Sequence, residues 1–305
     1  MKIIEIFPET YALIATVAWV VSTLVINQGL KRKPDTGSGV YQIAVGLNVS
    51  LITGCLFLSF VVLPRVSIAD VSVFLILAGV FSFPFGTGLY YYASQKYEDR
   101  SELAAQFNKT KPLFAVGFGI FVVGESLSST TAIALVFITV GLAVLLVGTI
   151  RGRFSNVAMV LGTATAVAWA LGDGFMTLGV AGIDPLVATY VALVAGTVVY
   201  LIISLPVLLM RTPNARVLTE PWLVFFVGHG ILSFAIGYTA FFSSIAEIGL
   251  TRSALITAFW PFLAIILGYM IQIFRGEKNQ AAVDRRYFLP AAIILTIGSI
   301  IAILS

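Results

Sequence analysis

The chain of 305 residues is 59% hydrophobic and only 10% charged, with a mean hydropathy of +1.02. A soluble fold of this length has too little interior to cover so much apolar side chain, so lipid must solvate most of its surface. The formal net charge of +4 comes from basic residues scattered over many loops, without the basic stripe that a nucleic-acid partner requires.

Apolar runs of about 20 residues, separated by short clusters of Gly, Pro and charge, predict helices that cross a bilayer. Barrel strands would be about half as long and would alternate in polarity. We predict ten spans, at residues 10–30, 40–63, 70–95, 102–123, 128–150, 157–180, 185–209, 221–247, 252–274 and 286–304. The only cysteine, Cys55, lies inside the second span, so the chain has no disulfide framework.

The two halves of the chain repeat one another. Five pairs of residues match in order at one constant offset: Gly88 with Gly237, Ser94 with Ser243, Ala105 with Ala254, Pro112 with Pro261, and Gly119 with Gly268. Val17-Ala18-Trp19 in the first span also recurs as Val167-Ala168-Trp169 in the sixth, and Gly124-Glu125 recurs as Gly276-Glu277. Several ordered matches predict a duplication, with repeats at residues 1–152 and 153–305.

Each repeat has five predicted spans, and this odd number fixes how the repeats are oriented. The second copy must enter the membrane from the opposite side, so the two copies form an inverted pair, as in many secondary transporters. The sequence therefore predicts an all-α integral membrane protein with ten transmembrane helices, arranged as two inverted five-helix repeats around a central cavity.

The basic residues predict an orientation. Thirteen of the 18 lie in loops that follow odd-numbered spans, three lie on the other side, and Lys109 and Lys111 lie within the fourth span. The positive-inside rule places the basic loops in the cytoplasm and both termini outside.

The layout resembles that of the drug/metabolite transporter superfamily, and in particular its EamA-like branch. The features that carry the resemblance are the inverted five-plus-five layout, an Ala-Trp in the first span of each half, and a proline within spans four and nine followed by Gly-Glu. The resemblance implies a transporter of small organic molecules, such as amino acids, other metabolites or drugs. Members of this family usually keep both termini in the cytoplasm, in contrast to the charge-based prediction. Span four also has Asn108, Lys109 and Lys111 where many members are apolar.

Ionisable residues within a span are normally retained only where they face a cavity or a partner. At 100° per residue, Lys109 shares a face with Glu102 and Gln106, whereas Asn108 and Lys111 point elsewhere. The two lysines are therefore not expected to line the same cavity. Each either snorkels or pairs with a carboxylate, or it binds an anionic group of the substrate, as resemblance to the organophosphate translocators of the superfamily suggests.

Asp173 lies well inside span six, four residues after Trp169, so the indole and the carboxylate share one helix face. One interpretation makes Asp173 the ion-pair partner of a span-four lysine. The others make it the carrier of a coupling proton or the receptor of a substrate ammonium group, which together with a lysine would recognise a zwitterion.

Further candidate residues lie in other spans. His229, the only histidine, is a second proton-coupling candidate or else a packed, hydrogen-bonded residue. Aromatic side chains are candidates to stack on a substrate or to form an apolar wall: Trp19, Tyr90, Trp169, Tyr238 and Trp260. Asn48 is a candidate hydrogen-bond donor to the substrate.

Other features predict bends and helix contacts. Pro112 and Pro261 each remove a backbone hydrogen bond and are the expected gating points. Glu125 and Glu277 are expected to cap their helices at opposite membrane faces. The small residues Gly46, Ser50 and Gly54 form a stripe in span two that suits an internal contact or a homodimer.

No motif for catalysis, metal binding or phosphate binding occurs, so we expect neither an enzyme nor a cofactor. The predicted function is secondary-active transport of a small polar, amino-acid-like metabolite by alternating access in the cell membrane, as a monomer or homodimer. The alternatives are an antiporter of anionic, phosphorylated or carboxylate, metabolites and, from a different class, a passive channel.

Overall fold

The structure is a computed structural model that describes residues 7–32, 39–96, 107–150, 156–209, 220–260, 262–263, 266–267, 270 and 285–305. All regular secondary structure in these ranges is helical. Within the described ranges, eight helical stretches are long and apolar enough to cross a membrane. Two more helical segments, beginning at Asn108 and at Leu250, take the places of predicted spans four and nine. Together they give the ten membrane helices that the sequence predicts.

In the first half, α1 is Pro8–Arg32, α2 is Gly39–Val62, α3 is Val73–Val80, the π-helix η3 is Phe81–Thr87, α4 is Gly88–Lys96, the 3-10 turn η5 is Asn108–Thr110, α6 is Lys111–Phe118, the π-helix η6 is Gly119–Val123 and α7 is Ser129–Ile150. In the second half, α8 is Asn156–Gly179, α9 is Pro185–Leu209, α10 is Leu223–His229, the π-helix η8 is Gly230–Gly237, α11 is Tyr238–Ile248, α12 is Leu250–Thr257 and α14 is Arg285–Leu304. Two short 3-10 turns, η1 at Leu63–Arg65 and η2 at Ile68–Asp70, join α2 to α3.

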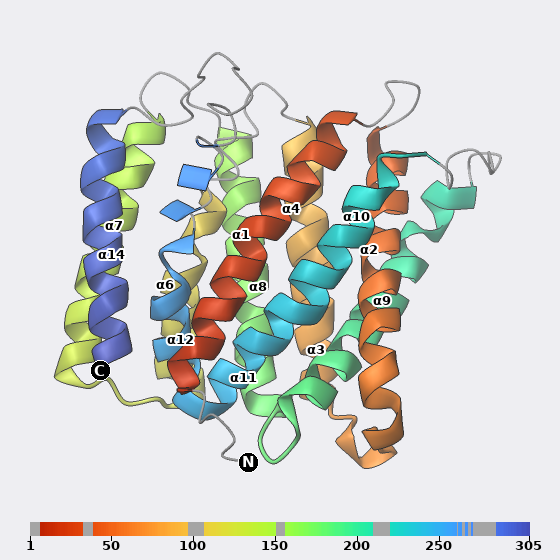
Figure 1. The fold of residues 1–305 in the computed structure, drawn as a ribbon, viewed down its shortest axis with the longest axis horizontal. Helices are drawn as coiled ribbons and strands as arrows, with labels where there is room; N and C mark the ends of the chain where they lie inside the picture. Colours follow the sequence, from red (N-terminus) through yellow and green to blue (C-terminus); the bar gives the residue numbers. More distant parts are fainter. Residues whose placement is uncertain are drawn as a thin grey trace.

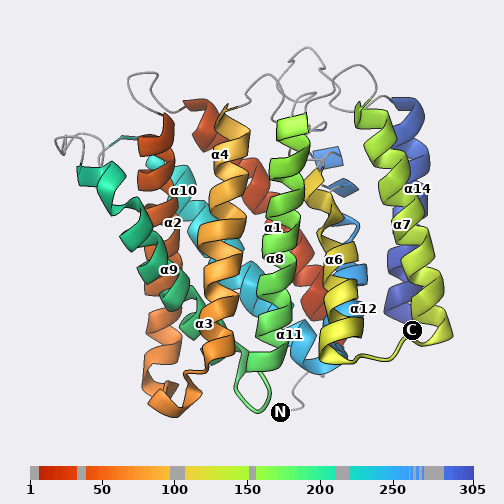
Figure 2. The ribbon, with the colours of Figure 1, turned by 180° about the vertical axis from the view of Figure 1, so that it is seen from behind.

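The halves run in opposite directions through the bundle. In Figure 1, α1 rises from the lower end, near the N-terminus, whereas α8 starts at the upper end and descends; Figure 2 shows the same from behind. The C-terminal helix α14 ends at the lower end as well. The inverted arrangement that follows from five spans per repeat is therefore present.

The repeats are interleaved, because helices of one half pack on helices of the other. Helix α1 packs along α10, η8 and α11, while α8 packs along α3 and η3. Helix α2 lies against α9, and α7 pairs with α14 at one side of the bundle. Large apolar side chains such as Phe60, Phe121 and Ile202 point away from these contacts and are exposed, as expected for a surface in lipid.

Two wide turns occur at matching places in the repeats. The π-helices η3 and η8 lie in the middle of spans three and eight, and their first residues, Phe81 and Gly230, are separated by the same offset as Pro112 and Pro261. In η3, Pro84 lacks the amide hydrogen that a regular helix needs, which favours an irregular turn. Within this turn the carbonyl of Ser82 accepts hydrogen bonds from Trp169 Nε1 of the other half, at 3.1 Å, and from Thr87 Oγ1, at 3.2 Å.

The small-residue stripe of span two serves an internal contact. Ser50 Oγ donates to the carbonyl of Phe226 in α10 at 2.8 Å, and a side chain at Gly46 would collide with the Phe226 ring. Gly54 lies against the backbone of Gly230 in η8. The stripe is thus covered by the second half of the same chain.

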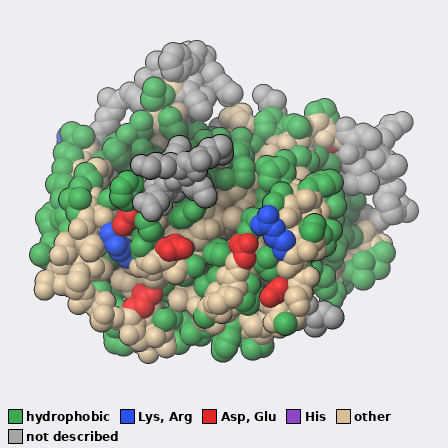
Figure 3. Space-filling view, turned by 60° about the horizontal axis from the view of Figure 1, so that its bottom comes forward, with side chains coloured by type: hydrophobic (Ala, Val, Ile, Leu, Met, Phe, Trp, Pro, Cys, Tyr) green, Lys and Arg blue, Asp and Glu red, His purple; other side chains and the backbone are tan. Residues whose placement is uncertain are grey.

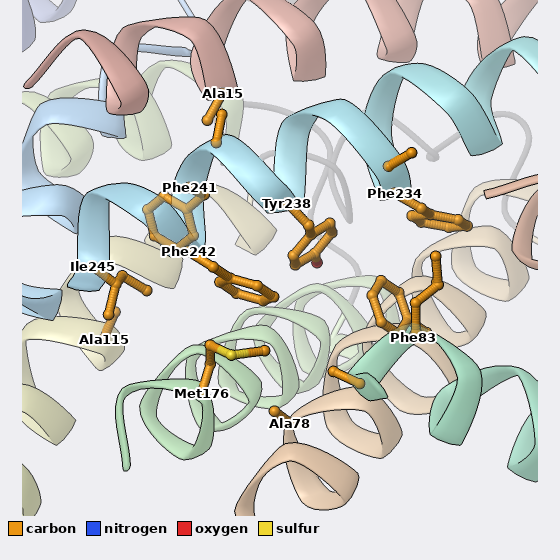
Figure 4. Packing of buried hydrophobic residues seen from close by; sticks show 14 of the residues in the cluster. Ala15, Ala78, Phe83, Ala115, Met176, Phe234, Tyr238, Phe241, Phe242 and Ile245 are labelled. Atoms are coloured by element: carbon orange, nitrogen blue, oxygen red, sulfur yellow. The ribbon is translucent and has the colours of Figure 1, made fainter. Parts of the chain in front are cut away.

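The lower end of the bundle is closed by buried side chains and by polar contacts between the halves. Figure 4 shows Phe241 and Phe242 of α11 lying near Ile245, Met176 of α8 and Ala115 of α6, all of them buried. At the surface of this end, where Figure 3 shows few charged groups, two ion pairs join the halves: Arg252 with Glu9 at 2.7 Å, and Arg65 with Asp184 at 3.9 Å.

Glu125 adds a third contact between the halves, and here the structure corrects a prediction. Its carboxylate does not cap its own helix but accepts hydrogen bonds from the backbone N–H groups of Leu250 at 2.6 Å and Thr251 at 2.8 Å. These are the first residues of α12, in the opposite half. A carboxylate at a helix N-terminus satisfies unpaired donors and favours the helix dipole. The corresponding Glu277 lies outside the described residues.

Candidate functional site

A cavity of about 70 Å³ lies between the halves at mid-depth. Its lining comes from both repeats: Trp19, Thr23, Ile26, Thr87, Tyr90, Asn108 and Lys111 from the first, and Trp169, His229, Ser233, Tyr238 and Trp260 from the second. The walls are mainly aromatic, with a few polar groups among them, which is the usual composition of a site for a small organic molecule.

The strongest electrostatic feature of the cavity is an ion pair between the halves. Lys111 Nζ lies 2.8 Å from Asp173 Oδ2, with the carboxylate fully buried and the lysine side chain 12% exposed. The interpretation of Asp173 as the ion-pair partner of a span-four lysine is therefore the one that the structure matches. Removing one member of a buried pair costs about 3–5 kcal/mol, because the other charge loses its partner.

Two aromatic rings complete the surroundings of the ammonium group. Lys111 Nζ lies 4.8 Å from the ring centroid of Trp19 and 4.7 Å from that of Phe241, which is the range of cation–π attraction. The two rings are themselves in contact, with centroids 5.1 Å apart. Lys111 is thus held by one carboxylate and two aromatic faces.

The repeat explains where these residues come from. Lys111 directly precedes Pro112, and Trp260 directly precedes the matching Pro261. Lys111 and Trp260 both line the cavity. Trp19 and Trp169 occupy matching positions in α1 and α8, and Thr23 stands four residues after Trp19 as Asp173 stands four after Trp169. Matching positions of the two halves thus lie in or beside one cavity, and the charged pair breaks the symmetry between the halves, because Lys111 matches Trp260 and Asp173 matches Thr23.

His229 faces the cavity and is also hydrogen-bonded. Its Nδ1 lies 2.6 Å from Ser22 Oγ in α1, while its ring contacts Tyr91 and Phe234 at centroid distances of 5.7 and 4.8 Å. Nε2 is buried and has no hydrogen-bond partner among the described residues. The structure thus matches the interpretation of His229 as a packed, hydrogen-bonded residue, and its role in proton coupling stays a prediction.

Asn108 contributes a second unpaired group. The residue is 2% exposed and its Oδ1 has no hydrogen-bond partner among the described residues. A buried polar atom without a partner costs about 1–3 kcal/mol. A polar ligand in the cavity would recover this cost at Asn108 Oδ1 and at His229 Nε2.

The remaining aromatic candidates form the walls. Tyr90 lies against Trp169, with ring centroids 5.8 Å apart, and Trp19 meets Tyr238 edge-on at 5.5 Å. Trp260 lines the cavity from the segment that follows α12.

Two candidates lie elsewhere. Asn48 donates to the carbonyl of Ala44 at 2.8 Å and to Ser204 Oγ at 2.9 Å, so it joins α2 to α9 away from the cavity. Lys109 is buried but is not among the residues that line the cavity, whereas Asn108 and Lys111 are. The helical-wheel separation of the two lysines is confirmed.

Of the two prolines predicted as gating points, the structure describes only Pro112. Pro112 is buried in the first turn of α6, directly after the 3-10 turn η5, where a missing amide hydrogen is tolerated. Span four is therefore irregular directly before Pro112, in η5, and again after α6, in the π-helix η6. Pro261 lies outside the described residues.

Four lining residues were not predicted: Thr23, Ile26, Thr87 and Ser233. The repeat contained a signal for Thr23, since it matches Asp173. Thr87 and Ser233 lie in η3 and η8, and no sequence feature other than Pro84 indicates those wide turns. Among the described residues, no three His, Cys, Asp or Glu side chains are grouped so that they hold a metal ion.

Two inverted five-helix repeats that share a cavity at mid-depth define a membrane transporter. The chain belongs to the EamA-like transporter family, whose model matches residues 6–147 and 156–278. It is thus a multi-pass integral membrane protein of the drug/metabolite transporter superfamily.

Comparison with solved structures agrees with this fold. Twenty-eight chains are similar. One of them, described only as "Crystal structure of protein", is 16% identical, with a TM-score of 0.70 over 97% of this chain and 96% of its own. At this identity the similarity shows the fold alone. No curated protein matches the sequence.

Proposed function

We propose that the protein is a secondary-active carrier of a small, polar, amino-acid-like metabolite in the cell membrane. The observation that carries the proposal is the Lys111–Asp173 pair at 2.8 Å within an aromatic cavity that both halves line. A cation and an anion side by side suit a substrate with both charges.

The transport cycle that fits this arrangement is alternating access. The lower end of the bundle is closed by Phe241, Phe242 and Met176 and by the Glu125 contact with α12. Release of the substrate at that end requires the halves to separate there, while the other end closes over the cavity. Pro112 and Pro261 are the proposed bending points of this movement.

Coupling to protons is proposed through Asp173, with His229 as the second candidate. Protonation of the carboxylate would remove the attraction for Lys111 Nζ and so free the lysine. In reconstituted vesicles, Asp173→Asn should abolish uptake driven by a pH gradient. Unaltered pH dependence would remove Asp173 from the coupling mechanism.

One observation favours the alternative of an antiporter for anionic metabolites, because Lys111 lines the cavity whereas Asp173 lies behind it. A purified-protein thermal-shift screen separates the two. Amino acids should stabilise the protein if the main proposal is correct, and sugar phosphates should do so if the alternative is.

The proposal of a carrier is tested by counterflow. Vesicles preloaded with the unlabelled amino acid that gives the largest thermal shift should transiently concentrate the labelled compound, and the initial rate should saturate. A passive channel would show neither effect, so linear, unstimulated flux would refute the carrier mechanism.

A further inference from the structure

The three groups around Lys111 Nζ are the groups that bind an organic ammonium ion. Asp173 provides a buried carboxylate 2.8 Å away, and Trp19 and Phe241 provide aromatic faces at 4.8 and 4.7 Å. Carboxylates and aromatic faces of this kind are used together by proteins that recognise ammonium ligands. Here the occupant of the site is a side chain of the protein itself.

The two aromatic walls of the site are positioned by contacts that do not involve Lys111. The Trp19 indole packs so closely on Gly237 of η8 that a Cβ atom there would lie 2.7 Å from its Nε1. Phe241 is fully buried in α11 and contacts Phe242. Asp173 is fully buried in α8. The three walls thus come from three different helices, and the two aromatic walls have contacts that do not depend on the lysine side chain.

Lys111 also separates the carboxylate from the cavity. The lysine lines the cavity and its side chain is 12% exposed, whereas Asp173 has no exposed surface and does not line it. A ligand in the cavity therefore reaches Asp173 only when the ammonium group of Lys111 leaves its place.

We propose that Asp173, Trp19 and Phe241 form an ammonium-binding site, in which the Lys111 side chain is a tethered occupant that the primary ammonium group of a substrate replaces. This proposal deepens the proposed function. It rests on that function only for the statement that the ligand of the site is the transported substrate. The existence of the site is independent of transport.

The charges define the class of substrate. A simple amine that displaced Lys111 would bring a second positive charge next to a single carboxylate, whereas a zwitterion brings its own carboxylate for the released lysine. The exchange then leaves the site neutral, which a poorly solvated cavity requires. The ligand class is therefore a small molecule with both an ammonium and an acidic group.

The site is tested by chemical rescue of Lys111→Ala. This substitution removes four heavy atoms, and n-propylammonium supplies the same four. The thermal midpoint of the purified variant should rise with n-propylammonium chloride in a saturable manner, because a ligand that binds only the folded state stabilises it. Equal concentrations of sodium chloride or of 1-propanol, the neutral isostere, should give smaller, unsaturable changes. The wild-type protein should show no such rise, since Lys111 fills the site.

Two double variants identify the walls. In Lys111→Ala/Asp173→Asn the rescue should be lost, and in Lys111→Ala/Phe241→Leu its half-maximal concentration should rise by about threefold or more, because one aromatic face is gone. If Lys111→Ala is too unstable to purify alone, recovery of monodisperse protein is measured with each additive present from solubilisation onward.

Three results would overturn the ammonium site. The first is a rise in thermal midpoint that is as large with propanol as with n-propylammonium, and the second is a rise in Lys111→Ala/Asp173→Asn as large as in Lys111→Ala. The third is no rise in Lys111→Ala although Lys111→Ala/Asp173→Asn is well folded. None of these measurements involves flux, so their failure is distinct from failure of the carrier proposal. Loss of counterflow with intact rescue would refute the proposed function and leave the site in place.

Discussion

Replacing Glu125 by alanine is expected to shift the transporter away from the closed arrangement of its lower end. Glu125 follows η6 in the first half, and both of its carboxylate oxygens bind the start of α12 in the second half. The residue before α12, Gly249, has a φ of 81° and lies so close that a Cβ there would be 2.8 Å from Glu125 Oε1. The contact is therefore tightly packed in this arrangement, and we expect it to break when the lower end opens.

The magnitude follows from the two hydrogen bonds. Bonds to a charged group contribute about 1.5–3 kcal/mol each, and the lower figure applies because Glu125 is only half-buried. Two such bonds give about 3 kcal/mol, which corresponds to a change of about 100-fold in the ratio of closed to open states. Glu125→Gln keeps one acceptor oxygen and loses the charge, so about half of this free energy should be lost.

The assay is the rate at which a thiol at position 115 reacts. Ala115 is fully buried, one helical turn from Lys111 toward the closed end. Ala115→Cys in a Cys55→Ala background should react slowly with a polar thiol reagent in detergent. Adding Glu125→Gln should accelerate the reaction, and adding Glu125→Ala should accelerate it most, by up to about 100-fold.

A separate measurement of thermal stability distinguishes a latch from an ordinary helix cap. If the midpoint of unfolding falls while the thiol rate stays within about twofold, Glu125 stabilises both conformations equally and the reasoning fails. If neither quantity changes, the two hydrogen bonds do not exist in solution.

Three substitutions test the packing between helices. Gly79→Ala should lower the free energy of unfolding by about 2 kcal/mol, because a Cβ atom would collide with the backbone of Ala192 in α9. Gly117→Ala has open space around its Cβ and should raise that free energy by about 0.5–1 kcal/mol through helix propensity. Trp169→Phe removes the hydrogen bond to the Ser82 carbonyl and should cost about 1 kcal/mol. Thermal or denaturant unfolding of the three variants measures each change, and a Gly79→Ala protein as stable as Gly117→Ala would contradict the helix contact.

The spans were predictable because bilayer thickness fixes the length of an apolar helix. Predicted span seven, 185–209, coincides with α9 at Pro185–Leu209, and predicted span three, 70–95, differs from Val73–Lys96 by a few residues. The ends were also visible in the sequence: Asp184 Oδ1 accepts from the N–H of Leu186 at the start of α9, where an Asp-Pro pair favours a helix start. The inversion of the halves followed from counting spans.

The site was predictable only in part. The helical period separated Lys109 from Lys111, but it did not indicate which of them meets Asp173, since that depends on how span four is rotated against α8. The π-helices η3 and η8 change the rotation of spans three and eight at mid-length, which brings Thr87 and Ser233 to the cavity. A uniform helical wheel does not contain this change.

The sequence by itself determined that the protein lies in lipid, that it has two related halves and that these halves are inverted, because hydropathy, repetition and parity are properties of the chain read in order. Only the tertiary structure decided that Lys111 pairs with Asp173, that Glu125 caps α12, and that the small residues of span two pack inside the molecule. The physical reason is that each of these contacts joins residues of opposite halves. Their partners are set by the relative rotation and depth of packed helices, which no local pattern along the chain encodes.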